Sequence, residues 1–347
     1  MSERVLASVE QIDAIIPIPD ADKICQYQIG GWKVVDQVGK YGVGDLIVYC
    51  SIDSWVPTEI APFLSKGNEP KEYNGIKGER LRTIRLRKAL SQGLLLPLSV
   101  LGGPEETFAI TSDSIGADVT QQLGIQKWEV AIPAQLRGLI KGNFPSRIPK
   151  TDQERIQNLK RELAEWQAAD KLWVVEEKYD GSSMTIYYMD GEFGVCSRNL
   201  DLKKDEVNTF WKVAIDNNLE EKLTNYCVAN NCNLAIQGEL LGEGVQGNRY
   251  KLQRHNVFVF DVFDIDKQMY YNCHARKQLV ETLGMKAVHT IEVRSLVGDT
   301  MDSLIERADG QSFLNSGTIR EGLVYKSVDD PSVSFKTISN KFLEKFE

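Results

Sequence analysis

The chain has 347 residues, of which 42% are hydrophobic and 26% are charged, and its formal net charge is −8. This length exceeds one typical domain, so two folded domains are expected. No run of about eighteen apolar residues and no apolar N-terminal signal region occurs, which predicts a soluble intracellular protein, cytoplasmic or nuclear, without a membrane span. The negative charge disfavours a protein that coats nucleic acid with its whole surface, but it is compatible with a local basic face.

The six cysteines and three histidines show no spacing typical of a metal site. The nearest cysteines, Cys227 and Cys232, have no second pair or histidine doublet that would complete a zinc site. We therefore expect reduced cysteines that behave as small, partly buried hydrophobic side chains.

Short β-branched and aromatic runs, separated by glycine, fill residues 1 to about 125. Gln26–Ile29 and Trp32–Val35 flank a pair of glycines, and Asp45–Tyr49 follows Gly44. Such runs predict short strands joined by tight turns, arranged as a small barrel or sandwich.

A basic cluster lies between residues 77 and 88, where Glu79 is the one acid. The strand parity of its arginines changes near residues 83–84, and a β-bulge there would place all four on one face. Such a stripe would follow the phosphates of a nucleic acid. The alternative is a solvated strand face paired with local acids. The cations of this cluster are Lys77, Arg80, Arg82, Arg85, Arg87 and Lys88.

Residues 126–150, which include Pro145 and Pro149, are expected to connect two domains. Thr151 and Glu154 then form a capping-box pattern, which predicts the start of a helix. Apolar residues at helical spacing support this helix. They are Ile156, Leu159, Leu163 and Trp166.

From Leu172 onward the pattern predicts strands that alternate with helices. The expected strands are Trp173–Val175, Met184–Tyr188, Leu234–Ile236, Val257–Phe260, Leu323–Lys326 and Val333–Lys336. The expected helices are Glu206–Asn225 and Arg276–Leu283.

Lys178 ends an apolar stretch of strand character and is followed by Tyr179, Asp180 and Gly181. A free lysine has a pKa of roughly 10.4, so it needs nearby cations or a divalent metal to release its amine. The amine can then attack the α-phosphate of a nucleotide and expel pyrophosphate, leaving a lysine-linked phosphoramidate. Gly181 permits close backbone approach, and Asp180 is a short acceptor for nearby groups or metal-bound water.

Carboxylates and cations on later strands suit the same reaction. Glu239 and Glu321 lie on separate predicted strands and could hold a hydrated Mg²⁺ or a ribose hydroxyl. Lys326 and Lys336 could stabilise charge on the α-phosphate and on the leaving pyrophosphate. Singly, each of these residues also fits an ordinary surface or strand position, so their joint order carries the prediction.

Phe258 and Phe260 share strand parity, and either ring offers a face on which a purine could stack. Ordinary burial tendency favours core packing for such residues by roughly two to one. Both interpretations stay open at this point.

These segments, in this order, resemble the motifs of the covalent nucleotidyltransferases, a group that includes RNA ligases, DNA ligases and mRNA-capping enzymes. The N-terminal segment Ile16–Asp22 with Gly31-Trp32 and Gly44-Asp45 is similar to the OB-type module of one RNA ligase clade, the Deinococcus type. The motif matches are Lys178–Gly181 (I), Ser197–Asn199 (Ia), Glu239 (III), Phe260-Asp261 (IIIa), Glu321 with Lys326 (IV) and Lys336 (V).

The resemblance implies an α+β chain with an OB-like, nucleic-acid-binding β-barrel over residues 1–125 and a connector over 126–150. Residues 151–347 would form an ATP-grasp-like nucleotidyltransferase domain of antiparallel sheets flanked by helices, the fold of DNA and RNA ligases. The implied activity is sealing of 3′-OH/5′-phosphate nicks in duplex RNA or RNA/DNA hybrids by a monomer, through a lysyl-AMP intermediate. ATP and Mg²⁺ or Mn²⁺ are the implied cofactors.

The same resemblance implies a role for each matched residue. Catalysis is assigned to Lys178, Asp180, Glu239, Glu321, Lys326 and Lys336. Nucleotide binding is assigned to Glu177, Lys178, Gly181, Arg198, Glu239, Phe258, Phe260, Lys326 and Lys336. Metal binding, directly or through water, is assigned to Asp180, Glu239 and Glu321. Nucleic-acid binding is a hypothesis drawn from the basic cluster itself, and it is assigned to Arg80, Arg82, Arg85, Arg87 and Lys88.

Motif V departs from the family pattern, because many relatives carry a second lysine where this chain has Ile338. Lys341 is the nearest substitute. Eleven residues follow Lys336, so we expect no OB domain after motif V, which disfavours a DNA ligase or an mRNA guanylyltransferase. Those two enzymes, and a catalytically silent nucleic-acid-binding protein, remain the alternatives.

Overall fold

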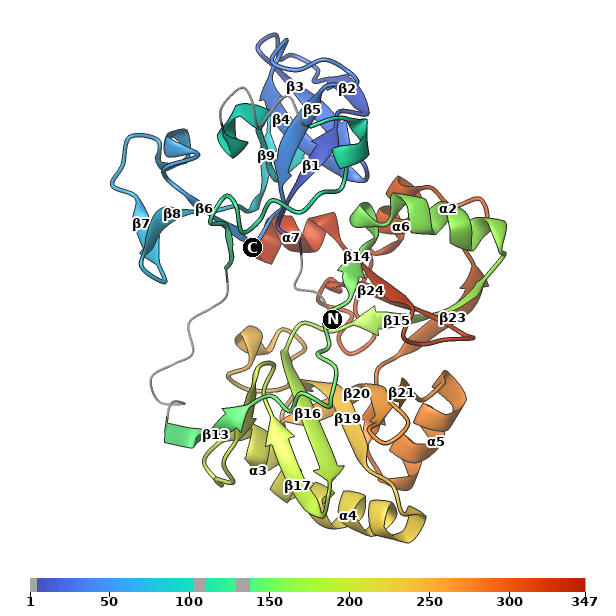
Figure 1. Ribbon diagram of the computed structural model, residues 1–347. Coiled ribbons are helices and arrows are strands. Elements are labelled where there is room, and N and C mark those ends of the chain that lie inside the picture. The colour runs from blue at the N-terminus through green and yellow to red at the C-terminus, as the bar shows by residue number, and fades with distance from the viewer. Residues whose placement is uncertain (1–4, 103–109, 129–137, 347) are drawn as a thin grey trace. The chain divides into compact units, whose positions relative to one another are not determined.

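The computed structural model describes residues 5–102, 110–128 and 138–346, and the chain divides into two compact units (Figure 1). The first unit comprises Met1–Ala131 and Leu343–Glu347, and the second comprises Ile132–Phe342. Two segments of the expected connector form strands. β12 (Gln126–Lys127) belongs to the first unit and β13 (Ile140–Asn143) to the second.

Short antiparallel strands build the first unit. They are β1 (Ala7–Gln11), β2 (Ala14–Pro17), β3 (Ile24–Ile29), β4 (Trp32–Gln37), β5 (Leu46–Cys50), β6 (Ser54–Pro57), β7 (Lys71–Tyr73), β8 (Ile76–Arg80), β9 (Thr83–Leu86), β10 (Ala89–Gln92), β11 (Leu94–Leu96) and β12. The strand orders are β1-β5-β11, β2-β3-β4, β12-β6-β8-β7 and the hairpin β10-β9.

Strand β5 shows how this unit forms its core. Successive side chains of a strand point to opposite faces. Ile47 and Tyr49 accordingly lie in one buried cluster, and Val48 and Cys50 lie in another. Burial of both faces is typical of a barrel or sandwich, and the prediction of a small N-terminal β-domain is confirmed.

The predicted β-bulge at residues 83–84 is wrong. β8 ends at Arg80 in the four-stranded sheet, whereas β9 pairs with β10 in a separate hairpin. Arg80 and Arg85 therefore lie on different sheets and not on one face of one strand. Arg87 and Lys88 form the turn of the hairpin with φ values of 49° and 69°. Between β8 and β9 the chain passes from the four-stranded sheet to the hairpin, so the parity of the arginines changes without a bulge.

Two larger sheets build the second unit. Their strands are β13, β14 (Glu154–Arg155), β15 (Leu172–Lys178), β16 (Ser182–Met189), β17 (Glu192–Cys196), β18 (Leu200–Leu202), β19 (Leu234–Leu241), β20 (Asn256–Asp264), β21 (Met269–Tyr270), β22 (Lys286–Ala287), β23 (Thr290–Ser295), β24 (Gly322–Ser327) and β25 (Ser334–Ile338). One sheet has the order β13-β18-β17-β16-β19-β20-β21 with β22 beside β20, and the other has the order β14-β25-β24-β15-β23.

Helices accompany these sheets and are labelled in Figure 1. They are α2 (Lys160–Ala168), α3 (Thr209–Asp216), α4 (Leu219–Asn230), α5 (Cys273–Thr282), α6 (Met301–Arg307) and α7 (Asn340–Phe346), whose residues from Leu343 onward belong to the first unit. α3, α4 and α5 pack on the larger sheet, because they and its strands supply one buried cluster. None of the helices in the described part of the chain has the length and apolar character needed to span a membrane.

The capping box predicted at Thr151 is wrong. Glu154 and Arg155 form β14, which pairs in parallel with β25, and α2 begins only at Lys160. The N-cap residue of α2 is Leu159, whose side chain makes no capping hydrogen bond. Backbone pairing with a distant strand therefore overrides the local helix-start signal.

The long helix predicted over Glu206–Asn225 is two helices, α3 and α4. Asn218 adopts φ 54° and ψ 39° between them, and this left-handed conformation interrupts the helix. Asn208 caps α3 by accepting from the backbone N–H groups of Phe210 and Trp211. The helix predicted near residues 276–283 is confirmed as α5.

Candidate active site

Strand β15 carries Lys178 at its C-terminal end and has two chemically different faces. Trp173 and Val175 point into a buried apolar cluster shared with β24 and β25. By alternation, Glu176 and Lys178 lie on the opposite face. In the neighbouring strand β24, Lys326 is paired with Val174, and Val324 is paired with Glu176. In the next strand, β25, Lys336 is paired with Val324. The register of three strands thus places Lys178, Lys326 and Lys336 on one face of this sheet.

Lys178 is held as an ammonium ion by carboxylates. Its Nζ donates to Glu321 Oε2 at 2.9 Å, and its side chain is 24% exposed. Burial opposes the charged form, but the charges of Glu321 and Glu239 outweigh it and raise the pKa of Lys178. Without a further cation nearby, the Lys178 amine therefore stays protonated and unreactive.

Glu239 completes this charge cluster. Its Oε1 accepts from the backbone N–H of Gly181 at 2.9 Å. Burial, reinforced by the charge of Glu321 and opposed by that of Lys178, raises the pKa of Glu239 to about 7. Two carboxylates thus surround a single ammonium group, so an additional cation is electrostatically favoured beside them.

Gly181 is required by a close approach between strands. A Cβ atom at this position would lie 2.4 Å from the carbonyl oxygen of Leu240 and 2.4 Å from Cδ2 of Leu241. Any side chain here would push the end of the Lys178 segment away from β19, which carries Glu239.

Asp180 and Arg198 have protein partners in this structure. The Asp180 carboxylate forms an ion pair with Arg249, and its backbone N–H donates to Tyr250 Oη at 2.7 Å. Arg198 donates to both carboxylate oxygens of Asp152, at 2.7 and 2.8 Å. Arg249 was not singled out by the sequence, because it lies outside every motif in the loop after β19.

The three predicted metal ligands do not come together as one group. Across residues 5–102, 110–128 and 138–346, no cluster of three or more His, Cys, Asp or Glu side chains is arranged to hold a metal ion. Asp180 is paired with Arg249, whereas Glu239 and Glu321 both face Lys178. The donor set that fits a divalent cation is this carboxylate pair, supplemented by water as Mg²⁺ prefers.

Lys326 belongs to a buried network of charges. Its Nζ donates to Asp261 Oδ1 at 2.7 Å and to the carbonyl of Phe260, and it lies 3.4 Å from Glu176 Oε2. Arg276 of α5 joins the same network through Glu176 and the same carbonyl. Lys326 thus lies on the Lys178 face of the sheet, buried as the partner of two acids.

The two candidate lysines of motif V occupy different settings. Lys336 is half-buried on the Lys178 face of the sheet. Lys341, the expected substitute for the missing second lysine, lies in α7, is largely exposed and pairs with Asp309 at 3.0 Å.

Phe258 and Phe260 differ in their surroundings. The β19–β20 register passes from Val259 to Asp261 without a counterpart for Phe260, which marks a β-bulge at that residue. Phe258 is 5% exposed and packs edge-to-face on Tyr179 with ring centroids 5.3 Å apart. Phe260 is half-buried, with the Lys326 ammonium 5.7 Å from its ring centroid.

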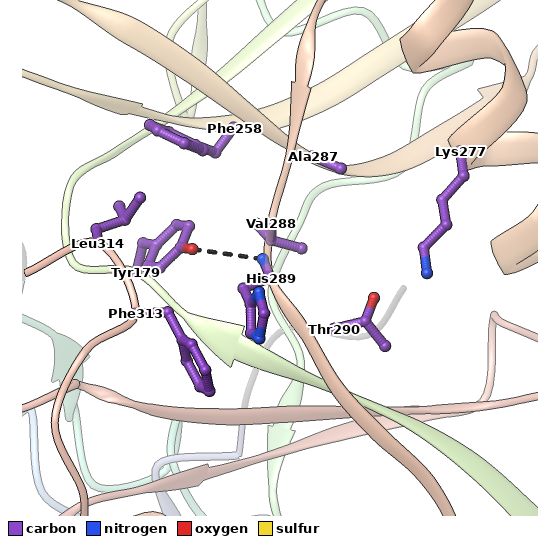
Figure 2. Close-up of a pocket in the computed structure, with 9 residues that line it drawn as sticks. All are labelled: Tyr179, Phe258, Lys277, Ala287, Val288, His289, Thr290, Phe313 and Leu314. Atoms are coloured by element: carbon purple, nitrogen blue, oxygen red, sulfur yellow. Dashed lines mark hydrogen bonds between the residues drawn. The ribbon is translucent and has the colours of Figure 1, made fainter.

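A cavity of about 400 Å³ adjoins the end of β15 (Figure 2). The two residues that flank Lys178, Glu177 and Tyr179, form hydrogen bonds with the segments that line this cavity. Tyr179 Oη accepts from the backbone N–H of His289 at 3.4 Å, and Glu177 Oε2 accepts from that of Phe313 at 3.0 Å. The rings of His289 and Phe313 stack with centroids 3.7 Å apart. The lining residues are Tyr179, Phe258, Lys277, Ala287, Val288, His289, Thr290, Phe313 and Leu314.

Comparisons with known proteins identify the family of this chain. A model of the RNA ligase family matches residues 171–338, and an OB-fold domain model matches residues 6–98. A glutamate variant of Naegleria gruberi RNA ligase, solved with AMP and Mn, is 40% identical with a TM-score of 0.88, covering 99% of each chain. The chain belongs to the RNA ligase family. The resemblance to RNA ligases and the predicted fold are thereby confirmed.

Two further structures of the Naegleria RNA ligase are equally similar to this family member. One, solved with pyrophosphate, is 40% identical over 99% of each chain with a TM-score of 0.87. The other, a lysine variant with ATP and Mn, is 40% identical over 98% of each chain, also with a TM-score of 0.87. A search of the curated proteins found no match.

The predicted nucleic-acid contacts of this RNA ligase family member fall into two groups. Arg80 is partly buried, pairs with Asp53 Oδ1 at 2.6 Å and lies over the ring of Trp128 at 3.8 Å, so it stabilises the fold of the first unit. Arg85 is exposed on the β9–β10 hairpin and pairs with Glu344. The other exposed cations are Arg82, Arg87 and Lys88.

The aliphatic residues of β9 are exposed as well. Ile84 is 48% exposed and Leu86 is 39% exposed, whereas Leu81, which precedes the strand, is buried. The β9–β10 hairpin, residues 83–92, thus presents cations and aliphatic side chains together.

Proposed function

We propose that this protein is an ATP-dependent RNA ligase that seals 3′-OH/5′-phosphate nicks in duplex RNA or RNA/DNA hybrids. The observation that carries the proposal is the placement of the Lys178 amine 2.9 Å from Glu321 and beside half-buried Glu239, in a chain of the RNA ligase family. The two acids keep this lysine protonated, and a cation that neutralises them would release the amine for attack on a phosphate.

The proposed reaction has three displacements. Lys178 loses its proton and attacks the α-phosphorus of ATP, so that a P–N bond forms and pyrophosphate leaves. The AMP group then passes to an oxygen of the 5′-phosphate, which releases the Lys178 amine. The 3′-hydroxyl attacks the activated phosphorus, which forms the phosphodiester and releases AMP. Each step exchanges one bond to phosphorus for another, which is the advantage of a covalent intermediate.

Glu239 and Glu321 would hold Mg²⁺ or Mn²⁺, directly or through water. When bound, the cation would supply positive charge that lowers the pKa of Lys178 and neutralises charge on the phosphates. The excess negative charge around Lys178 supports this assignment. A structure of the Naegleria RNA ligase contains ATP and Mn, which supports a divalent cation as a cofactor of this family.

Other residues of the site would bind the nucleotide. Phe260, which is half-buried beside Lys326, is a better stacking surface for the adenine than Phe258, which is packed on Tyr179. Arg198 and Lys336 would contact phosphate oxygens, as bidentate or point-charge donors. Gly181 would keep Lys178 close to Glu239.

The first unit would hold the nicked duplex. The proposed phosphate contacts are the exposed cations Arg82, Arg85, Arg87 and Lys88, as the sequence predicted. Arg80 is instead proposed to stabilise the fold of this unit through Asp53. Membership of the Deinococcus-type clade, the domain bounds 1–125 and 151–347, the monomeric state and the intracellular location stay predictions.

Label transfer tests the proposal. The protein is incubated with α-labelled ATP or GTP and Mg²⁺ or Mn²⁺, with Lys178→Ala alongside, and separated on a denaturing gel. Label from ATP that is lost in the variant, together with sealing of a 3′-OH/5′-phosphate nick, is the expected result. Label from GTP would indicate capping chemistry, and sealing of nicked DNA alone would indicate a DNA ligase. No label with either nucleotide would leave a binding protein.

A further inference from the structure

Arg276 is a buried arginine outside every motif of the family. It lies in α5, is 2% exposed and forms charge-assisted hydrogen bonds with both carboxylate oxygens of Glu176, one of them at 3.0 Å. Its Nη1 also donates to the main-chain carbonyl of Phe260. One guanidinium therefore joins the nucleophile strand β15 to the bulge of β20.

The Phe260 bulge depends on donors from outside its own sheet. The β19–β20 register skips Phe260, and its carbonyl accepts from Arg276 and from Lys326. A buried carbonyl without a donor is costly, so these two cations stabilise the bulged conformation. The bulge is what places Phe260 and Asp261 on the same side of the strand, with Phe260 beside Lys326 and Asp261 bonded to it.

The charges of this network are balanced. Glu176 and Asp261 face Arg276 and Lys326, and all four side chains are buried. Burial opposes ionisation of Glu176, but Lys326 and Arg276 outweigh it and lower its pKa. The planar guanidinium binds both carboxylate oxygens of Glu176 and the Phe260 carbonyl at once, and a lysine ammonium lacks this bidentate geometry.

We propose that Arg276 is a positioning residue for ATP binding, which holds the Phe260 bulge so that the ring faces the adenine and keeps Lys326 on Asp261. This inference rests on the proposed function, because it assigns Phe260 to the base. The hydrogen bonds of Arg276 go to Glu176, Phe260 and Cys273 and not to Lys178. Its loss should weaken ATP binding and leave the rate of lysine adenylation at saturating ATP nearly unchanged.

A double-mutant cycle tests the proposal. Arg276→Lys retains a positive charge beside Glu176 but loses the bidentate guanidinium geometry. Phe260→Ala removes the aromatic ring. Each single variant should raise the KM for ATP and weaken ATP binding roughly tenfold to a hundredfold, the range typical for loss of one base–aromatic stack. The double variant should bind ATP no more weakly than Phe260→Ala alone. Additive effects, or a fall in kcat with an unchanged KM, would overturn the proposal.

Controls separate positioning from folding. Arg294→Lys alters another arginine with a carboxylate partner, Asp299 at 2.6 Å, and should leave the KM for ATP unchanged. Glu176→Gln combined with Arg276→Gln removes both charges together, so it avoids an unpaired buried ion and should still melt cooperatively. It should show the same raised KM, because the Phe260 carbonyl loses its arginine donor. A normal KM in a folded double variant would contradict the proposal.

Calorimetric titration with ATP distinguishes the two levels of inference. If the wild-type protein takes no AMP label but the variants show coupled losses of ATP affinity, the ligase assignment is refuted and Arg276 is retained as a positioning residue. If the wild-type protein takes the AMP label but the effects of the two substitutions on ATP affinity are additive, the ligase assignment is retained and the role of Arg276 is refuted. Absence of ATP binding by the wild type would refute both.

Discussion

Lys178 Nζ lies 2.9 Å from Glu321 Oε2, although 143 positions separate the two residues in the chain. Antiparallel pairing of β15 with β24 brings them together, because Lys178 is paired with Gly322 directly after Glu321. Lys178 and its carboxylate partner are thus placed by backbone register. The same carboxylate that positions the amine also stabilises its protonated form, so a cation is needed to release it.

Glu321→Gln should make Lys178 more acidic. Burial already opposes the ammonium form, and the charge of Glu321 is the largest contribution that opposes this effect. Removal of that charge should therefore lower the pKa of Lys178 and shift its pH-dependent labelling by an amine reagent to lower pH. Mass spectrometry of the Lys178 peptide without nucleotide measures this shift. Glu192→Gln, a change at an exposed acid near Lys141, is the control, and an unchanged midpoint in Glu321→Gln would refute the prediction.

Gly181→Ala should abolish most of the adenylation activity. The added Cβ would lie 2.4 Å from the Leu240 carbonyl, so the segment that carries Lys178 must move away from Glu239. We expect a melting temperature several degrees lower, from a loss on the order of 1–3 kcal/mol, and at least a tenfold slower label transfer. Gly142→Ala is the matched control, because nothing lies within 4 Å of the position that its Cβ would take and its φ is not positive. Equal effects of both substitutions would show that the close approach is unimportant.

The strands of the second unit were largely predictable from sequence, but their contacts were not. The lysine at the end of β15 and the acids on β19 and before β24 follow from short apolar runs that end in polar residues. Their proximity depends on pairing between segments far apart in the chain. The same long-range pairing explains the failed capping box, because Glu154 joins Phe335 of β25 instead of starting a helix.

Several residues of the candidate site carried no sequence signal. Arg276 lies in an ordinary amphipathic helix, and its charge is meaningful only because α5 packs beside the Phe260 bulge. Arg249, His289 and Phe313 lie in loops or at strand entries without motif spacing. The partner of Asp180 and the cavity walls therefore emerged only from the fold.

Arg80 and Arg87 should separate fold from nucleic-acid binding in the first unit. Arg80→Ala removes an ion pair with Asp53 and a stacking contact with Trp128, so it should lower the melting temperature. Arg87→Ala should leave melting unchanged, weaken binding to a nicked RNA duplex and reduce the slope of its salt dependence by about one ion. Binding titrations over a range of salt and thermal melts give both values. Unaltered binding by Arg87→Ala would remove the hairpin turn from the proposed interface.

Glu239→Gln should stabilise the protein at pH 8 and have little effect at pH 5. The pKa of Glu239 is raised from 4.5 to about 7, chiefly by burial, so its protonated form is favoured by folding. That stability is present below about pH 4.5 and is lost as pH rises through about 7, where the buried carboxyl must ionise. Glutamine stays neutral and can still accept from Gly181, and Lys178 keeps Glu321 as its partner. We expect a gain on the order of 1 kcal/mol at pH 8, less than the full shift implies because solvent reaches the site. Thermal melts of both proteins from pH 5 to pH 8 measure the difference, and a gap that does not widen with pH would show that Glu239 is already ionised at low pH in the folded state.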